Sequence, residues 1–211
     1  MEIRDSGRGF KFVCNPNHHA SWWTFEDEQS VRDAMWHPGP GDTILDVGCA
    51  FGSYILPSLA ADVAKVYAWN PLKSELDLMR ASLEANDWGG RVKIFQMALH
   101  AHPGYVNPDT SEFKTEEFPG AFQAKTLDSY LDQIEATGRC WLKMDVEGAE
   151  VDVLNGGITL INKLRPTILI EGHEFHRSGI TGEVETLLAS HGYRTEANEP
   201  YHSVRHILLL P

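Results

Sequence analysis

The stretch Thr43-Ile-Leu-Asp-Val-Gly-Cys-Ala-Phe-Gly-Ser53 decides the fold. Its first five residues predict a buried strand, and the glycines at positions 48 and 52 predict a tight turn before a helix begins. Glycine permits a close approach that a Cβ would block, and the first turn of a helix leaves backbone N–H groups unpaired. Because ligands of open α/β sheets bind beyond the carboxyl ends of strands, this turn is a candidate ligand site. A tight turn without a ligand is the alternative.

Outward from this stretch, short aliphatic and β-branched runs alternate with segments of helical periodicity, as they do in crossover units of a parallel sheet. Strands are predicted at 43–47, 65–69, 92–97, 140–146 and 167–171. Helices are predicted at 25–36, 53–62, 73–86, 127–136, 149–163 with a break at the Gly156-Gly157 pair, and 183–191. In the helix at 73–86 the leucines and a methionine line one side, and the charged residues fall mostly elsewhere.

The C-terminal part departs from this alternation, because two strands, 193–196 and 204–210, follow each other directly. They predict a hairpin that adds an antiparallel strand at or near the edge of the sheet. The segment 102–120 is the longest irregular stretch, and loops of this length are often lids or binding loops. We therefore predict a single-domain α/β fold over 41–211, with a mixed sheet and helices on both faces, preceded by an N-terminal appendage with a helix over 1–40.

Composition and charge narrow the classes of partner. The 211 residues are 42% hydrophobic and 23% charged, which is ordinary for a globular protein and excludes a disordered or low-complexity chain. The 18 Lys and Arg against 30 Asp and Glu give a net charge of −12, which would repel a phosphate backbone. Nucleic acid is therefore not an expected partner.

The apolar stretches and the cysteines of the sequence predict the location of the protein and the redox state of its thiols. No apolar stretch approaches the roughly 20 residues of a membrane span, and the first residues lack the apolar core of a secretory signal, so the expected location is the cytoplasm. The three cysteines, Cys14, Cys49 and Cys140, are odd in number and far apart. We expect reduced, buried thiols rather than disulfides or a cysteine zinc site.

The spacing within the turn distinguishes between cofactors. The dinucleotide pattern G-x-G-x-x-G is not met, which disfavours NAD. Asp46 stands just before the first glycine, where its charge would oppose a pyrophosphate and suit a cofactor that carries an ammonium or sulfonium group.

The segment Asp46-Val-Gly-Cys-Ala-Phe-Gly52 resembles motif I of the class I S-adenosylmethionine-dependent methyltransferases. Further along, Thr126-Leu-Asp-Ser-Tyr-Leu131 and Leu142-Lys-Met-Asp-Val-Glu-Gly-Ala-Glu-Val-Asp-Val-Leu-Asn-Gly156 resemble the signature of the FkbM-type methyltransferase family. The resemblance extends over about 22–176 and includes Val66-Tyr-Ala-Trp-Asn-Pro71 and Met97-Ala-Leu-His100. It implies a Rossmann-like fold with a seven-stranded mixed sheet whose last strand is antiparallel, and S-adenosylmethionine as the cofactor.

The resemblance also implies which positions hold that cofactor. They are Asp46, Gly48, Ala50, Gly52, Asn70, Ala98 and Leu99. The glycine turn would surround the methionine portion, and the pair at 98–99 would lie near the adenine. Family members usually end their second strand with an acid that grips both ribose hydroxyls, whereas this chain has Asn70. An amide still pairs with a diol, but without charge-assisted strength.

Methyl transfer to oxygen needs an in-line approach and a base for the hydroxyl proton. Asp145 and Glu147 lie at the carboxyl end of the fourth strand, where a period of two turns them to one side with Lys143 behind them. His173 follows the fifth strand, and its ordinary pKa suits a general base. A hydrogen-bonded loop histidine is the alternative for His173, and a favourable helix start is the preferred reading of Glu150.

A metal site is a weaker alternative. The segment Glu171-Gly-His-Glu-Phe-His176 lacks the H-E-x-x-H spacing of a zinc protease. Asp145 and Glu171 would end neighbouring strands, where paired carboxylates could hold Mg²⁺ with water and a substrate hydroxyl. A divalent metal is not the favoured expectation.

The sequence therefore predicts an enzyme, an S-adenosylmethionine-dependent O-methyltransferase that acts on a hydroxyl of a small molecule or glycan. Catalytic roles are assigned to Asp145, Glu147 and His173. One alternative is a binding module that keeps the pocket but has lost transfer, which Asn70 motivates. A nicotinamide-dependent oxidoreductase rests only on the general strand-turn-helix pattern. The acceptor and the oligomeric state stay open.

Overall fold

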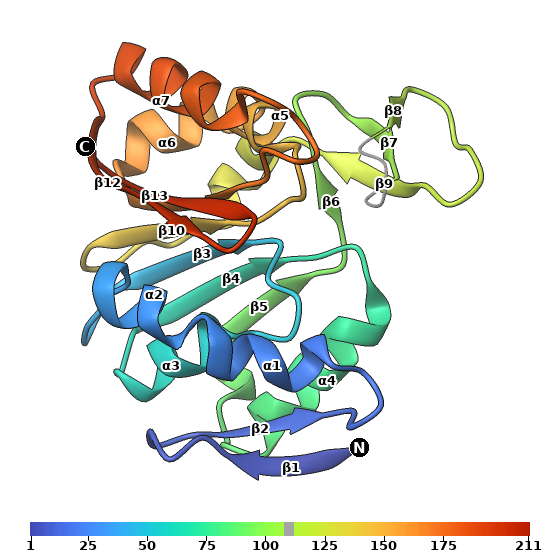
Figure 1. Cartoon of the computed structure of the whole chain (residues 1–211), viewed down its shortest axis with the longest axis vertical. Helices are drawn as coiled ribbons and strands as arrows, with labels where there is room; N and C mark the ends of the chain where they lie inside the picture. The colour runs from blue at the N-terminus through green and yellow to red at the C-terminus, as the bar shows by residue number, and fades with distance from the viewer. Residues whose placement is uncertain (108–111) are drawn as a thin grey trace.

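A seven-stranded sheet forms the centre of the protein (Figure 1). The structure is a computed structural model and describes residues 1–107 and 112–211. The strands of this sheet are β3 (Thr43–Val47), β4 (Lys65–Trp69), β5 (Val92–Phe95), β10 (Cys140–Met144), β11 (Thr167–Gly172), β12 (Arg194–Tyr201) and β13 (Val204–Leu210). They lie in the order β12-β13-β11-β10-β3-β4-β5.

The pairing of these strands confirms the predicted mixed sheet. Strands β5, β4, β3, β10 and β11 are mutually parallel. Strand β13 is antiparallel to both of its neighbours, β11 and β12, so the C-terminal hairpin closes one side of the sheet. The parallel arrangement brings the carboxyl ends of five strands to one edge, which is where the candidate site residues follow in sequence.

Helices cover both faces of the sheet (Figure 1). One layer holds α1 (Ala20–Asp27), α2 (Gln29–Met35), α3 (Ile55–Ala60) and α4 (Lys73–Glu84). The other holds α5 (Glu150–Asn155), α6 (Ile158–Leu164), α7 (Ile180–Ser190) and the 3₁₀ helix η2 (Leu127–Gln133). A short 3₁₀ helix, η1 (Gly89–Arg91), leads into β5.

Period-two geometry divides the core between the two layers. Ile44 packs with the apolar side of the α1–α4 layer, whereas Leu45 and Val47 pack with the other layer. Helix α4 presents Leu76 and Met79, both fully buried, to the first core, as its predicted amphipathic pattern requires.

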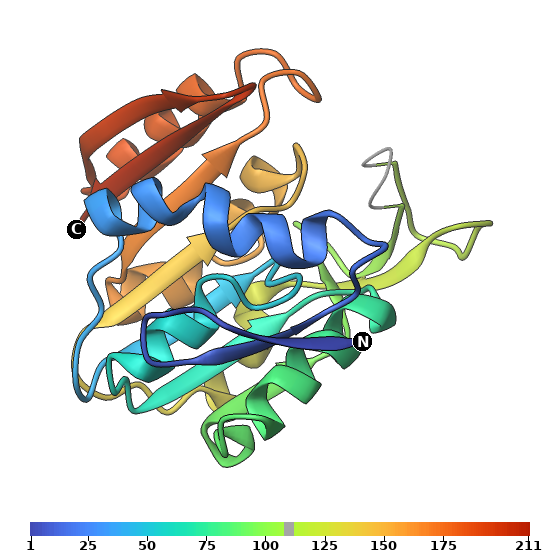
Figure 2. The same ribbon diagram turned by 60° about the horizontal axis from the view of Figure 1, so that its bottom comes forward.

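The N-terminal segment is part of the first core. It forms a hairpin of β1 (Glu2–Asp5) and β2 (Lys11–Cys14) beside α4, followed by α1 and α2 across the sheet (Figure 2). Phe12 stacks on Phe25 with ring centroids 4.4 Å apart, and the Val13 amide donates to Ser82 Oγ at 2.8 Å. The helix predicted over 25–36 is thus two helices that meet at Glu28.

A small four-stranded sheet is the largest departure from the sequence prediction. Within the described parts of the predicted irregular stretch 102–120 and its flanks lie β6 (Ala98–Leu99), β7 (Gly104–Val106), β8 (Phe113–Lys114) and β9 (Phe122–Lys125). Residues 108–111 of that stretch lie outside the described residues. The strands have two to four residues, too few for a periodic pattern to mark them. This sheet extends outward from the body (Figure 1).

Two further expectations can be compared with the structure. All three cysteines are buried and free, as predicted. Over the residues that the structure describes, no helix is long and apolar enough to cross a membrane.

The carboxylate of Asp42 joins the beginnings of the two central strands β3 and β10. It accepts hydrogen bonds from the backbone amides of Gly39 and Arg139, each at 3.0 Å, and from the indole N–H of Trp141 at 3.1 Å. Burial by itself would raise the pKa of this carboxyl, but these donors outweigh it and lower the pKa. The charged form of Asp42 therefore stabilises the register of β3 on β10.

Replacing this charge should weaken the fold without touching the site at the other end of the strands. We expect Asp42→Asn to lower the free energy of unfolding by about 1.5–3 kcal/mol, the range for hydrogen bonds to charged groups. Asp62→Asn is the matched control, because Asp62 is 78% exposed and pairs with Arg91 at the surface; it should change stability by less than about 0.5 kcal/mol. Urea unfolding followed by tryptophan fluorescence measures both, and equal effects would contradict the assignment.

Candidate active site

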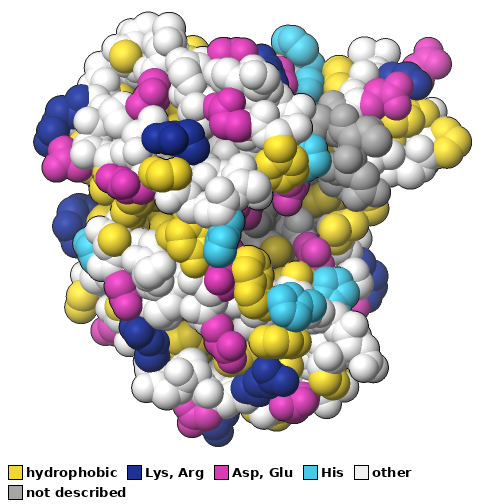
Figure 3. Space-filling view, viewed as in Figure 1, with side chains coloured by type: hydrophobic (Ala, Val, Ile, Leu, Met, Phe, Trp, Pro, Cys, Tyr) yellow, Lys and Arg dark blue, Asp and Glu magenta, His cyan; other side chains and the backbone are white. Residues whose placement is uncertain are grey.

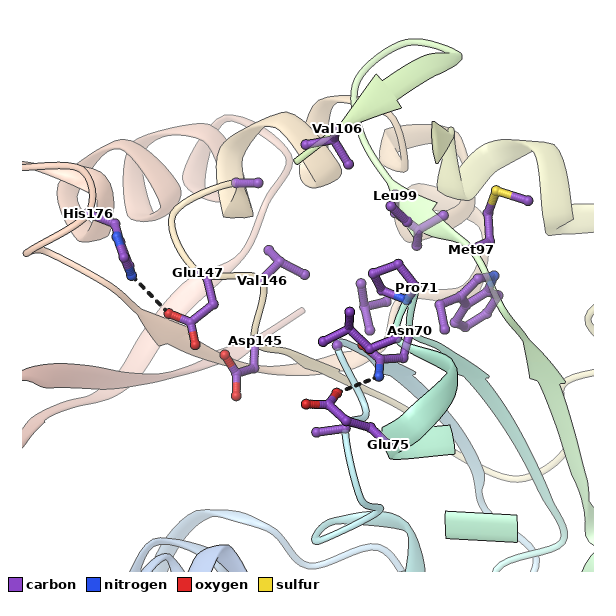
Figure 4. A pocket seen from close by; sticks show the side chains of 17 residues that line it. Asn70, Pro71, Glu75, Met97, Leu99, Val106, Asp145, Val146, Glu147 and His176 are labelled. Carbon is purple, nitrogen blue, oxygen red and sulfur yellow. Dashed lines mark hydrogen bonds and ion pairs between the residues drawn. The ribbon is translucent and has the colours of Figure 1, made fainter. Parts of the chain in front are cut away.

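A cavity of about 460 Å³ opens at the carboxyl ends of β3, β4 and β10. The surface around it is hollowed between the body and the small sheet, and hydrophobic and histidine side chains gather there (Figure 3). Residues from both sheets and from α4 line the cavity (Figure 4). They are Val47, Gly48, Ala50, Trp69, Asn70, Pro71, Leu72, Glu75, Met97, Ala98, Leu99, Val106, Asp145, Val146, Glu147, Ala149 and His176.

Gly48 fixes the turn after β3 against the end of β10. Its backbone has φ +80°, and a Cβ at this position would lie 1.7 Å from the carbonyl oxygen of Asp145. The Asp145 amide in turn donates to the Val47 carbonyl at 2.9 Å, and the Gly48 amide donates to the Trp69 carbonyl at 2.9 Å. Only a residue without a side chain allows these strand ends to approach so closely.

Five of the seven positions implied for cofactor binding line the cavity. These are Gly48, Ala50, Asn70, Ala98 and Leu99. Ala50 has φ +41°, a left-handed conformation that Gly or Asn adopts with less strain. Gly52 is not a lining residue. A Cβ at this position would meet Met79 Cγ at 3.1 Å, so close packing against α4 favours glycine here.

Asp46 is not among the residues that line the cavity. It is 2% exposed, and its register partner on β10 is Lys143, on the same face of the sheet. Burial raises the pKa of Asp46 to about 7, although the nearby Lys143 ammonium opposes the shift. Asp46 therefore belongs to a buried charge cluster rather than to the cavity wall.

Lys143 is the centre of that cluster. Its Nζ atom lies 3.6 Å from Glu171 and 4.0 Å from Asp145, and the side chain is 1% exposed. Burial alone would lower the pKa of Lys143, but Asp145, Glu171 and other carboxylates outweigh it and raise the pKa, so the ammonium keeps its charge.

The two carboxylates beside Lys143 differ in their affinity for a proton. Glu171 accepts from His206 Nε2 at 3.2 Å, and this bond together with Lys143 outweighs burial and lowers the pKa of Glu171 to about 2. Burial and the Glu171 charge raise the pKa of Asp145 well above its ordinary value. A proton arriving at this pair is therefore held by Asp145.

His173 lies among four carboxylates. Its Nδ1 atom is 3.2 Å from Glu150, and its Nε2 atom is 3.3 Å from Glu147 and 3.7 Å from both Asp145 and Glu171. Burial would lower the pKa of His173, but the hydrogen bond to Glu150 and the surrounding charges raise it to about 9. The sequence assigned His173 as the general base, whereas an imidazole with this pKa already carries its proton at neutral pH.

Glu150 has both a helix role and a site role. It is fully buried at the start of α5, where its Oε1 atom accepts from the Gly148 amide at 3.1 Å as well as from His173. Glu147, with φ +54°, turns instead toward the cavity, where its carboxylate lies 3.1 Å from His176 Nε2 (Figure 4). His173 itself is not a lining residue.

The donor atoms of Asp145, Glu171 and His173 lie within 4.8 Å of one another, the geometry of a metal-binding group. The charges do not fit a divalent ion, because the Lys143 ammonium already stands beside both carboxylates and His206 donates to Glu171. A cation is thus built into this cluster, and we assign no metal to it.

The structure adds cavity residues to which the sequence analysis assigned no cofactor or catalytic role. Glu75 is one of the charged residues predicted to lie mostly away from the apolar side of its helix; it is partly buried and lines the cavity beside Asn70. Met97, Val146 and His176 also line it. In the sequence, these residues are marked only by their place shortly after strands whose carboxyl ends meet at the cavity.

The contact between Gly48 and the Asp145 carbonyl gives the first prediction for the site. We expect Gly48→Ala to lower the free energy of unfolding by more than about 4 kcal/mol or to prevent folding, because a Cβ would displace backbone at the end of β10. Gly41→Ala is the control. Gly41 has a similar φ of +84° with no atom within 4 Å of the added Cβ, so only the backbone strain of about 1–2 kcal/mol applies. Urea unfolding that shows equal losses for the two variants would contradict the contact.

The environment of His173 predicts a pH dependence of stability. Folding raises the pKa of His173 from 6.5 to about 9, so the stabilisation from its charged form is complete below pH 6.5 and is lost as the pH rises through about 9. The stability difference between the wild type and His173→Gln should therefore shrink between about pH 6 and about pH 9.5 in urea unfolding. His37→Gln, the same replacement at an exposed histidine, is the matched control. A pH-independent difference for His173→Gln would contradict the raised pKa, because it would show that folding leaves the pKa of His173 unchanged.

Comparison with known proteins gives the family of the chain and its fold relatives. The family model of the methyltransferase FkbM domain matches residues 46–195. The methyltransferase FkbM from Methylobacillus flagellatus KT superposes with a TM-score of 0.65 at 15% identity, over 93% of this chain and 48% of that chain. The present chain thus spans about half the length of that protein. No curated protein matches the chain.

Two other solved structures share the fold. Fibrillarin from Aeropyrum pernix, solved with natively bound S-adenosyl-L-methionine, has a TM-score of 0.56 at 14% identity over 90% of this chain and 76% of its own. Precorrin-6y C5,15-methyltransferase from Geobacter metallireducens GS-15 has a TM-score of 0.53 at 12% identity over 95% and 93%. At these identities the likeness concerns the fold alone. Because the family model covers more than two thirds of the chain, the protein belongs to the FkbM methyltransferase domain family.

Proposed function

We propose that this protein transfers the methyl group of S-adenosylmethionine to a hydroxyl oxygen of a small molecule or glycan. The observation that carries the proposal is that the Gly48 turn and Asp145 line one cavity. The Gly48 turn, where the resemblance puts the methionine portion, and the strand-end acid Asp145 line the same space and are in backbone contact. A methyl donor and a proton acceptor can therefore share one site.

The cavity has the properties that such a cofactor requires. Apolar side chains, Trp69, Met97 and Leu99 among them, suit an aromatic base, and backbone at Gly48 and Ala50 is open to close approach. The carboxylates that line it favour a ligand with a positive centre. The volume of about 460 Å³ is within the range of small-molecule sites. When bound, the cofactor would supply an electrophilic methyl on a sulfonium centre.

The charged residues at and behind the cavity have different roles toward the proton of the acceptor hydroxyl. Asp145 has a raised pKa and lines the cavity, so we assign it the acceptance of the hydroxyl proton as the new C–O bond forms. Protonated His173, held by Glu150, orients Glu147 and Asp145 from behind. Lys143 and Glu171 form the charged support that keeps Asp145 in place.

The mouth of the cavity favours a neutral or cationic acceptor. The net charge is −12, and Glu147 with its partner His176 stands at the rim. Phe175 is 58% exposed, and its ring centroid lies 4.2 Å from that of His176. An exposed aromatic face of this kind suits the C–H surface of a sugar or an apolar scaffold. These features support an uncharged hydroxyl compound over a phosphorylated one.

The test separates cofactor binding from transfer. Isothermal titration with S-adenosylhomocysteine should show saturable binding to the wild type, and Asp145→Asn should keep that affinity within about threefold while losing at least about 100-fold in transfer rate, as expected for a lost general base. Transfer is measured with labelled S-adenosylmethionine on a panel of hydroxyl compounds and on extract of the source organism, with the methylated atom located by NMR.

The control is Asp132→Asn, a change at an exposed aspartate of η2, which should leave binding and transfer unchanged. A folded wild type that does not bind S-adenosylhomocysteine would contradict the proposal. Binding without transfer to any acceptor would favour the second candidate function, a binding module, for which Asn70 in place of an acid is the motivating observation.

A further inference from the structure

Glu75 places a carboxylate at the wall of the cavity. It belongs to the first turn of α4, just after β4 and the Pro71-Leu72 turn, and it lines the cavity next to Asn70 (Figure 4). Its neighbours Lys73 and Asp77 pair with each other at 2.6 Å on the exposed side of the same helix. Glu75 is thus separated from the surface charges of α4.

The side chain of Asn70 holds Glu75 in position. Asn70 Nδ2 donates to Glu75 Oε2 at 2.7 Å. The backbone of Asn70 is itself fixed, because its amide donates to the Phe95 carbonyl and its carbonyl accepts from the Met97 amide, each at 3.2 Å. The amide at the end of β4 therefore serves as the anchor for an acid that comes from the following helix.

The other oxygen of Glu75 has no protein partner among residues 1–107 and 112–211. No ion pair of Glu75 and no hydrogen bond to its Oε1 atom is found in this part of the chain. Partial burial raises the pKa of Glu75, although the Asn70 amide favours its charged form. A partly buried carboxylate gains most from hydroxyl or ammonium donors that a ligand brings.

The position of the Asn70–Glu75 pair along the cavity points to the kind of donor. The pair lies between Asp145, at the proposed transfer end, and Met97 with Leu99, at the apolar end (Figure 4). In an adenosyl sulfonium compound the ribose lies between the sulfonium and the adenine. The vicinal hydroxyls of the ribose then fall beside Glu75, and two adjacent hydroxyls match the two oxygens of a carboxylate.

We propose that Glu75, held by Asn70, is the carboxylate that binds the ribose diol in this protein. The inference rests on the proposed function, since it takes the ligand to be an adenosyl compound. It assigns the charged contact with the diol to the first turn of α4, whereas the resemblance implies that contact at the position of Asn70. An acid is thus present at the site although the end of β4 lacks one.

Isothermal titration with S-adenosylhomocysteine and with its 2′-deoxy and 3′-deoxy analogues tests the proposal on the full chain. The wild type should bind the complete ligand about 10- to 100-fold more tightly than either analogue, as expected for charge-assisted hydrogen bonds. Glu75→Gln keeps an acceptor for Asn70 and should fold. It should lose about 10- to 100-fold in affinity for the complete ligand and should no longer discriminate between the three. Asp77→Asn removes a charge from the exposed side of the same helix and should change none of these values.

The outcomes separate this inference from the proposed function. A wild type that binds none of the three ligands contradicts the proposed function and the inference with it. A wild type that binds all three equally overturns the inference alone, and this measurement does not depend on whether Glu75→Gln folds. The inference is also overturned if Glu75→Gln binds as the wild type does, or if it loses affinity for all three ligands equally, which would indicate a general effect on the pocket.

Discussion

The backbone contact between the Gly48 turn and the carbonyl of Asp145 is the constraint on which the site depends. Parallel strands end at one edge of a sheet, but a shared edge alone does not make two turns meet. Here the absence of a side chain at position 48 lets the turn after β3 rest on the end of β10. The strand-turn-helix unit and the acids after β10 therefore line one cavity, and the ends of β4 and of the small sheet complete it.

A second requirement is electrostatic. Asp46, Asp145 and Glu171 end or flank three neighbouring strands, and their mutual repulsion would oppose folding without a cation between them. The fully buried Lys143 meets that need. The same ion pairs leave one carboxyl of the cluster, Asp145, with a raised pKa and with access to the cavity. Support of the fold and preparation of a proton acceptor thus come from one arrangement.

The sequence predicts those parts of the molecule that local patterns determine. Strands β3 and β4 match their predicted bounds, because apolar runs between turn residues mark buried strands. The small sheet was missed, since strands as short as Ala98–Leu99 carry no period. Glu75 was missed for another reason. An acid in the first turn of a helix can face water or a cavity. The orientation of the helix on the sheet decides between them, and that orientation is determined by tertiary packing. The protonation of His173 likewise depends on carboxylates from two separate segments, 145–150 and the end of β11.

The central claim is that one ligand spans the cavity from the Gly48 turn to the small sheet. A crystal structure of the full chain with S-adenosylhomocysteine tests it most directly. The sulfur should lie between the Gly48 turn and Asp145, with the ribose at the Asn70–Glu75 pair and the adenine against Met97 and Leu99. Density for the ligand at any other place on the protein, or in this cavity with the adenine at the Asp145 end, would contradict the account.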